Sequence, residues 1–246
     1  MKKWVYIGID QTGAVDRKGK PRPLPVCFIR NKTVSFFYLS QFSRQEMINQ
    51  IQPLENEELV ICVDCVFGLP SQLKLTWRKA MKRIIKYDGY GMQVAREYFR
   101  DIGKGKVLRR EIEIACHANS VFIEKPFQKN IQTGTFRIWK DISFEENQFY
   151  APALEKLTDP DQIKIFEGYP SLSWRLLFGS NTRQPSRVSE FLRVSFPLIL
   201  FTPEQQLKLE QDPNLADALL LALTIKKFRK SAFLLKPSHE GWILGF

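Results

Sequence analysis

Four carboxylates stand where the surrounding sequence is apolar. Asp10 ends the run KWVYIGID, Asp64 ends ELVICVD, Glu167 ends QIKIFE, and Asp217 lies between two alanines in NLADALLLAL. A carboxylate in apolar surroundings needs a proton, hydrogen-bond donors or a cation, because burial disfavours its charged form. We therefore predict that these four acids belong to one catalytic site.

Two of these acids indicate metal chemistry. If the strands that end in Asp10 and Asp64 are parallel neighbours, the two carboxylates lie side by side at the edge where open α/β sheets bind ligands. They repel unless a cation lies between them, and ligation by oxygen alone suits Mg²⁺ or Mn²⁺. A pair of such ions about 4 Å apart activates water for attack on phosphorus. The predicted metal ligands are Asp10, Asp64, Glu167 and Asp217.

Each acid also has a structural interpretation that the sequence leaves open. An aspartate at the end of a strand often caps the following turn, and a lone aspartate on a helix often faces solvent. Asp212 has the position of an N-cap, because Pro213 follows it at the first position of a long helix.

Net charge points to a polyanionic partner. The chain of 246 residues carries 37 Lys and Arg against 26 Asp and Glu, a net charge of +11. Residues 74–110 hold twelve basic residues against three acids, which is +9 in that segment alone. Such an excess suits phosphate contacts with DNA or RNA, although a solvated helix face is the other interpretation. The predicted contacts are Arg78, Lys79, Lys82, Arg83, Lys86, Lys104, Lys106, Arg109 and Arg110.

The elements that must position these residues follow from hydrophobic periodicity. Strands are predicted at 3–10 and 58–64, and a hairpin at 25–39 turns at Asn31-Lys32. A third acid-bearing strand covers 162–167, and a further strand is predicted at 196–201. Helices are predicted at about 43–52, 73–87, 92–102, 170 onward, 184–193, 203–210 and 213 onward, whereas 103–150 has no clear periodicity.

Five segments resemble, in order, a domain-of-unknown-function family of predicted RNase H-like nucleases. They are IGIDQTGAV, VDCVFGLP, FEGYPSLSW, NLADALLLAL and EGWILGF, and they span nearly the whole chain. The resemblance implies an α/β fold with a five-stranded mixed sheet, in which an antiparallel meander of three strands precedes parallel strands flanked by helices. We expect one domain over residues 1–246, with a basic helical and irregular insertion at about 71–150.

The segment NLADAL is also similar to the last helix of Holliday-junction resolvases, where two acids three residues apart bind metal. Asp217 matches the second acid, and Asn214 replaces the first. An asparagine carbonyl can ligate but brings no charge, so the similarity suggests Asp212 as a compensating metal ligand. A resolvase-like role would also imply a homodimer.

The sequence favours a Mg²⁺- or Mn²⁺-dependent nuclease that hydrolyses phosphodiester bonds of DNA or RNA. Two alternatives stay open: a nucleic-acid-binding module with weak or no catalysis, motivated by Asn214, and a phosphotransferase related to actin-like and sugar-kinase ATPases. Those ATPases need a second glycine-rich phosphate loop, and the sequence of this chain contains none. No apolar run is long enough to span a membrane, and the N-terminus has no cleavage signal. We therefore expect no membrane partner and a cytoplasmic location.

Overall fold

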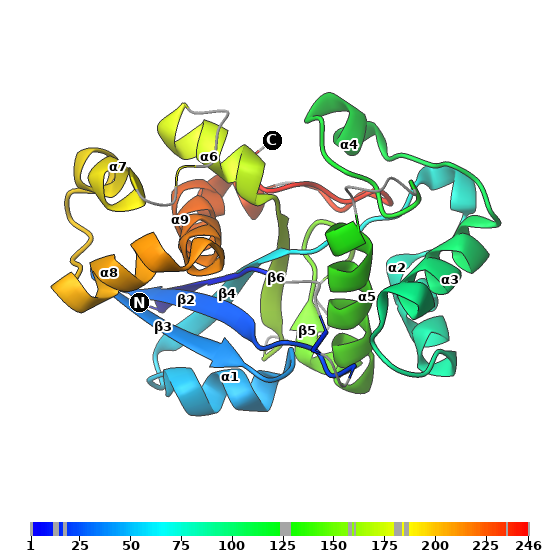
Figure 1. Ribbon diagram of the computed structural model, residues 1–246, viewed down its shortest axis with the longest axis horizontal. Coiled ribbons are helices and arrows are strands. Elements are labelled where there is room, and N and C mark those ends of the chain that lie inside the picture. The colour runs from blue at the N-terminus through cyan, green and yellow to red at the C-terminus, as the bar shows by residue number, and fades with distance from the viewer. Residues whose placement is uncertain are drawn as a thin grey trace.

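A mixed β-sheet organises the chain (Figure 1). The computed structural model describes residues 2–11, 15–16, 19–123, 129–156, 159, 161–179, 184, 187–234 and 236–245. Within these ranges the sheet has six strands in the order β3-β2-β1-β4-β6-β5. The strands are β1 (Lys3–Ile9), β2 (Leu24–Arg30), β3 (Thr33–Leu39), β4 (Glu57–Asp64), β5 (Phe149–Tyr150) and β6 (Ile163–Gly168).

Helices connect and cover these strands. The α-helices are α1 (Arg44–Ile51), α2 (Trp77–Arg83), α3 (Met92–Gly103), α4 (Glu111–Ala115), α5 (Lys129–Phe144), α6 (Pro170–Phe178), α7 (Val188–Ser195), α8 (Pro203–Gln211) and α9 (Pro213–Ala232). Short 3₁₀ helices are η1 (Ser71–Leu73), η2 (Ile84–Lys86) and η3 (Glu146–Gln148). None of the helices in the described ranges is long and apolar enough to cross a membrane.

Strand direction divides the sheet in two. The strands β1, β2 and β3 form an antiparallel meander, and Asn31 takes a left-handed conformation (φ 57°) in the predicted hairpin turn. The strands β4, β6 and β5 continue the sheet in parallel with β1. The predicted mixed sheet of an α/β fold, with an antiparallel meander ahead of parallel strands, is therefore present.

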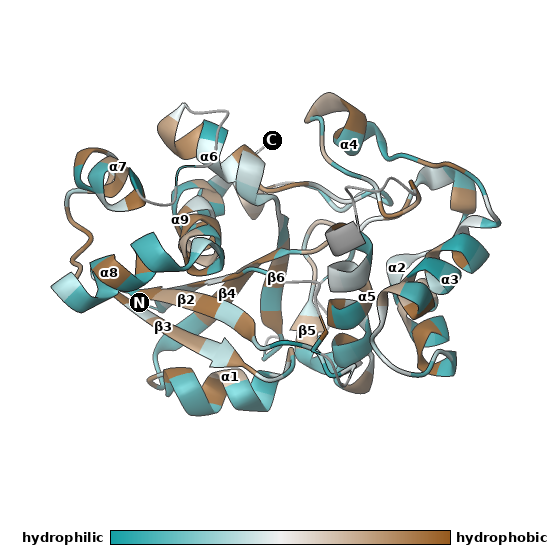
Figure 2. Ribbon diagram, viewed as in Figure 1, coloured by the Kyte–Doolittle hydropathy of each residue, from teal (hydrophilic) through white to brown (hydrophobic). Residues whose placement is uncertain are grey.

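Each face of the sheet has its own hydrophobic core. Ile7 and Ile9 of β1 pack with Trp139 of α5 in a core that also takes side chains from α1, α2 and α3. The other face packs against α9, with α6, α7 and α8 beyond it. Figure 2 shows the hydrophobic residues along the strands and the hydrophilic ones on the outer turns of α1 and α3. Because side chains alternate along a strand, neighbouring residues serve different cores.

Two expectations about the elements were wrong. The sheet has six strands and not five, because two residues, Phe149 and Tyr150, pair with β6. The apolar run at 196–201 is a turn with a single bridge from Leu200 to Thr33, and Leu198 and Leu200 are exposed. The segment 103–150, to which the sequence assigned no individual elements, contains α4 and the sixteen-residue helix α5, in keeping with the expected mixture of helical and irregular structure.

Candidate active site

Asp10 and Asp64 meet at the carboxyl ends of two neighbouring parallel strands. Ile9 of β1 pairs with Val63 of β4, so the next residue on each strand is an aspartate. Neighbouring strands lie about 4.8 Å apart, which places the two aspartates side by side. Both are buried, with 4% and 9% of their surface exposed. The predicted pairing of these two strand ends is confirmed.

Helix α9 approaches this edge unusually closely because β1 has a glycine there. A Cβ atom on Gly8 would lie 1.8 Å from the carbonyl oxygen of Ala218 and 2.4 Å from the nitrogen of Ala222. Only a residue without a side chain allows the backbones of β1 and α9 to touch in this way. The contact fixes the depth at which α9, and with it Asp217, lies against the sheet.

The direction of α9 then carries Asp217 to the same edge. Leu221 of α9 lies over Gly168 and Cys62, because a Cβ on Gly168 would meet both side chains. Asp217 precedes Leu221 by one helical turn, about 6 Å along the helix axis. Asp64 follows Cys62 by two residues, about 6.6 Å along the strand. Helix α9 runs antiparallel to β1, because Ala218 lies against Gly8 and Arg229, further along the helix, hydrogen-bonds to Tyr6. Asp217 and Asp64 therefore lie toward the same end of the sheet.

Polar groups of neighbouring elements hold these aspartates. The Gln11 amide donates to Asp64 Oδ2 at 3.3 Å, and the Trp174 indole of α6 donates to Asp217 Oδ1 at 3.3 Å. Burial, with a smaller contribution from the charge of Asp64, raises the pKa of Tyr169. We refer to Asp10, Asp64 and Asp217 as the aspartate edge.

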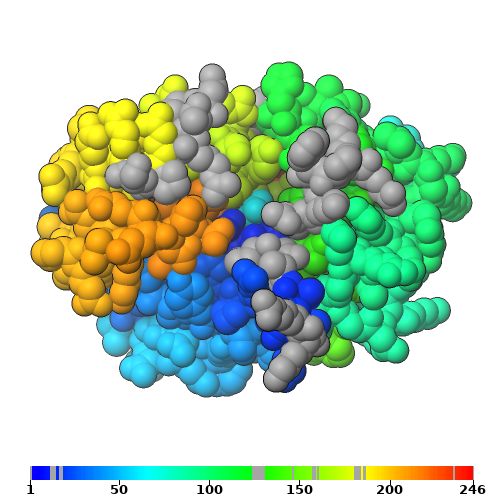
Figure 3. All heavy atoms as spheres, viewed as in Figure 1, coloured from blue at the N-terminus to red at the C-terminus, as the bar shows by residue number. Residues whose placement is uncertain are grey.

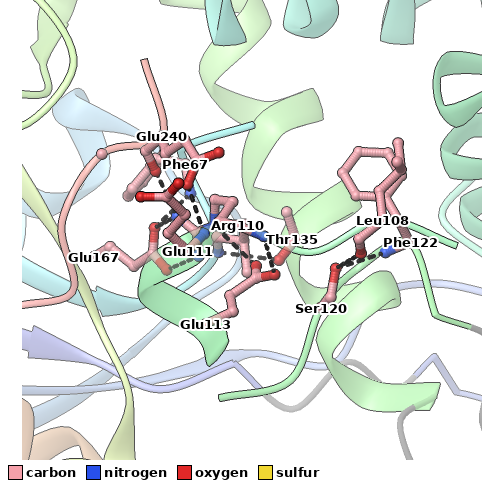
Figure 4. A network of polar contacts seen from close by, with 12 residues as sticks. Phe67, Leu108, Arg110, Glu111, Glu113, Ser120, Phe122, Thr135, Glu167 and Glu240 are labelled. Atoms are coloured by element: carbon pink, nitrogen blue, oxygen red, sulfur yellow. Dashed lines mark hydrogen bonds and ion pairs between the residues drawn. The ribbon is translucent and has the colours of Figure 1, made fainter. Parts of the chain in front are cut away.

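Glu167 was predicted to join this site, and the structure gives its carboxylate other partners. Glu167 pairs with Val63 of β4, so it shares the sheet face of Val63 and not that of Asp64. Its Oε2 accepts from Arg110 Nη1 at 2.8 Å and from the Phe67 amide at 3.0 Å, and its Oε1 accepts from Arg110 Nη2. Both carboxylate oxygens are thus engaged by protein donors (Figure 4), which does not fit the predicted ligand role.

Arg110 was predicted to contact nucleic acid, but it is completely buried. Its Nε donates to Glu113 at 2.8 Å, and its Nη1 also donates to the Glu240 carbonyl at 2.9 Å. Burial acts to lower the pKa of Arg110, but the charges of Glu167 and Glu113 outweigh it and raise that pKa. Burial raises the pKa of Glu113 in turn, with Arg110 acting in the opposite direction. We call Arg110, Glu113 and Glu167 the arginine clamp, which ties α4 to β6.

Asp212 has the cap role that its position predicts. Its Oδ1 accepts from the amides of Asn214 at 2.9 Å and Leu215 at 3.4 Å, and its Oδ2 accepts from the Tyr38 hydroxyl at 2.7 Å. Burial, followed by this hydrogen bond, raises the pKa of Tyr38 to about 12. Both oxygens of Asp212 therefore have partners on α9 and β3, and the structure gives no support to a compensating metal ligand.

The remaining basic residues of the predicted contact surface divide by exposure. Arg78 is part-buried and forms two hydrogen bonds with Glu155, at 2.7 and 2.6 Å, and one with the Phe149 carbonyl. It therefore anchors α2 to the sheet edge, and Arg109 is half-buried. The exposed residues lie on α2, η2 and the end of α3, and they are Lys79, Lys82, Arg83, Lys86, Lys104 and Lys106.

Figure 3 shows the orange residues of α8 and the start of α9 on one side of the blue N-terminal strands and the green residues of the chain's middle segment on the other. The side-chain atoms that the aspartate edge offers to a metal ion are carboxylate oxygens, the ligand type that Mg²⁺ and Mn²⁺ prefer. Within the described ranges no set of three His, Cys, Asp or Glu side chains is already arranged as a metal-binding group.

Sequence reasoning missed two residues that hydrogen-bond to the predicted acids, Gln11 and Trp174, and a third, Tyr169, whose pKa the charge of Asp64 helps to raise. Gln11 directly follows Asp10, and Tyr169 and Trp174 lie in the FEGYPSLSW segment. Their adjacency to the quoted motifs was the available signal. Their partners lie 43 or more residues away along the chain, and no periodicity predicts such pairs.

Comparisons with family models, with curated proteins and with solved structures find no match to this chain.

Proposed function

We propose that this protein is a metal-dependent nuclease of RNase H-like fold that hydrolyses phosphodiester bonds of DNA or RNA at the aspartate edge. The observation that carries the proposal is the register of β1 and β4, which sets Asp10 beside Asp64 while α9 brings Asp217 to the same end of the sheet. The strand order and the antiparallel meander before the parallel strands support the fold assignment.

Asp10, Asp64 and Asp217 would hold Mg²⁺ or Mn²⁺, and Glu167 is left out of the proposed ligand set because Arg110 engages it. When bound, such a cation lowers the pKa of a coordinated water and offsets negative charge at the scissile phosphate. The protein's own contribution is to fix the three carboxylates. Gln11 and Trp174 donate to Asp64 and Asp217 and so restrict the rotation of those two side chains.

The exposed basic residues of α2, η2 and α3 supply the proposed substrate-binding surface. Lys79, Lys82, Arg83 and Lys86 follow one another along α2 and η2, and Lys104 and Lys106 follow the end of α3. Each phosphate neutralised by such a side chain releases condensed counterions. Binding should therefore weaken steeply with salt, and Lys82→Ala combined with Lys86→Ala should reduce the slope of log K against log salt by about 1 to 2.

The experiment is cleavage of labelled duplex, single-stranded and branched DNA and of structured RNA, each with Mg²⁺, Mn²⁺ or chelator. Wild type is compared with Asp10→Asn and Asp64→Asn, and Asp161→Asn is the control because Asp161 is exposed beside the opposite end of β6. We expect cutting that needs the cation, that both site variants lose and that Asp161→Asn keeps.

Cleavage that survives in chelator, or in both site variants, would contradict the proposal. Binding of nucleic acid with no cleavage under either cation would instead support the binding module, for which Asn214 in place of an acid is the motivating residue.

A further inference from the structure

Gln11 is buried beside the aspartate edge with half of its amide group satisfied. Only 7% of its surface is exposed. Its Nε2 donates to Asp64 Oδ2 at 3.3 Å, whereas its Oε1 has no hydrogen-bond partner among the described residues. Burial of an unpaired carbonyl oxygen costs free energy. The hydrogen bond to Asp64 is therefore the polar contact of this amide group that the structure shows.

A glycine of the insertion makes room for this side chain. A Cβ atom on Gly134 of α5 would lie 1.7 Å from Gln11 Oε1, 2.0 Å from Cδ and 2.6 Å from Cγ. The side chain of Gln11 therefore lies directly on the backbone of α5. Gly134 stands inside a helix, where glycine is less favourable than alanine, so the close contact explains why glycine occupies this position.

The orientation of the amide follows from charge. The carboxylate of Asp64 accepts hydrogen bonds and repels a carbonyl oxygen, so the amide nitrogen must face it and the oxygen must face α5. With Gly134 behind it and Asp64 in front, Gln11 has no room to turn away. Helix α5 thus holds the amide nitrogen of Gln11 against the carboxylate of Asp64.

We infer that Gln11 is a positioning residue for Asp64, held in place by Gly134 of α5, and that it sets the affinity of the aspartate edge for a divalent cation. The inference rests on the proposed function. A residue that orients a ligand carboxylate typically contributes 10- to 100-fold to metal affinity. The helix that belongs to the basic insertion would thereby adjust the cation site without supplying a ligand to it.

The test is the affinity for Mn²⁺ alone, measured from the electron paramagnetic resonance signal of the free ion. We expect Gln11→Leu to raise the Kd for Mn²⁺ about 10-fold. Gly134→Ala should raise it in the same direction, because its methyl group displaces the Gln11 side chain. In a Gln11→Ala background, Gly134→Ala should have no further effect, since Gly134 acts only through Gln11.

Two matched controls separate positioning from folding. Gln162→Leu removes a glutamine with the same 7% exposure at the far end of β6, and Gly91→Ala adds a methyl group where nothing lies within 4 Å. Both should keep wild-type affinity. Thermal unfolding by circular dichroism identifies any variant that does not fold. If Gln11→Leu does not fold, Gln11→Asn, which keeps the amide on a shorter side chain, is used in its place.

The outcomes distinguish this inference from the proposed function. If wild type binds no Mn²⁺, or if Asp64→Asn binds it as tightly as wild type, the proposed site itself fails. If Asp64→Asn loses binding while folded Gln11 variants keep wild-type affinity, the inference is overturned and the proposed function stands. Equal effects of Gly134→Ala with and without Gln11 would also overturn it.

Discussion

The aspartate edge and the arginine clamp both gather buried carboxylates near the end of β6 and β4, but they hold them differently. In the clamp, Arg110 is completely buried and supplies charged donors to Glu113 and Glu167 from within the chain. At the aspartate edge, the partners of Asp64 and Asp217 include neutral donors, the amide of Gln11 and the indole of Trp174. The fixed guanidinium of Arg110 supplies charged hydrogen bonds to its carboxylates, whereas a neutral donor orients a carboxylate without neutralising its charge.

The largest expected change in the free energy of unfolding comes from removal of the arginine clamp. Arg110→Ala leaves Glu113 and Glu167 buried without their cation, and breaking a buried ion pair typically costs about 3 to 5 kcal/mol. We expect a loss of that size in the free energy of unfolding, measured by urea denaturation.

The matched control is Arg187→Ala, which removes an arginine that pairs with Glu190 on the exposed surface. Its stability should not change measurably. An Arg110→Ala protein as stable as this control would show that the clamp does not hold α4 to β6.

A smaller effect should follow when α9 is pushed off β1. Gly8→Ala would set a methyl group 1.8 Å from the Ala218 carbonyl oxygen, which is backbone and cannot rotate away. Overpacking of this kind costs about 1 to 3 kcal/mol. Because the helix carries Asp217, we also expect weaker Mn²⁺ binding, measured by titration of the folded variant. Gly91→Ala, in open space, should change neither quantity.

Asp212→Ala separates the cap from the aspartate edge. Loss of an N-cap side chain costs about 1 kcal/mol, and we expect that loss in thermal unfolding because Asp212 accepts from two amides of α9. The affinity for Mn²⁺ should stay at the wild-type value. A folded Asp212→Ala protein that loses Mn²⁺ binding would show that Asp212 is a metal ligand after all.

The smallest effect concerns pH. Burial raises the pKa of Glu113 in the folded state, so the folded protein binds this proton more tightly than the unfolded chain. Stability from this group is therefore present at low pH and is lost as pH rises from the ordinary glutamate pKa, about 4.3, through the folded value. We expect Glu113→Gln to flatten the fall in unfolding free energy with rising pH. An unchanged slope in urea denaturation at several pH values would contradict this.

The sequence predicted the aspartate edge better than the clamp for a physical reason. Strand alternation and apolar context mark Asp10 and Asp64, and a parallel register brings strand ends together without further information. The partner of Glu167 lies 57 residues earlier, at the N-cap of a short helix, and only the folded chain shows which sheet face Glu167 occupies. Basic composition likewise cannot separate Arg110 inside the protein from Lys82 or Lys86 on its surface.

Other differences follow from weak local signals. Helix α5 buries Phe136, Trp139 and Ile142 on one face, but it also carries a glycine and many polar residues, and the sequence alone left it unassigned. The run at 196–201 is apolar enough for a strand, but Leu198 and Leu200 remain exposed and no neighbouring strand pairs with it beyond one bridge in the described ranges. Burial and pairing, which depend on the whole fold, decided these segments.

The most direct test is the shift in melting temperature that Mg²⁺ or Mn²⁺ gives to wild type, Asp64→Asn and Glu167→Gln. A cation that binds only the folded protein stabilises it by about 2.7 kcal/mol at a hundred times its Kd. The account predicts a rise in melting temperature for wild type and for Glu167→Gln, each relative to its own value in chelator, and no rise for Asp64→Asn. A rise that survives in Asp64→Asn and disappears in Glu167→Gln would contradict it.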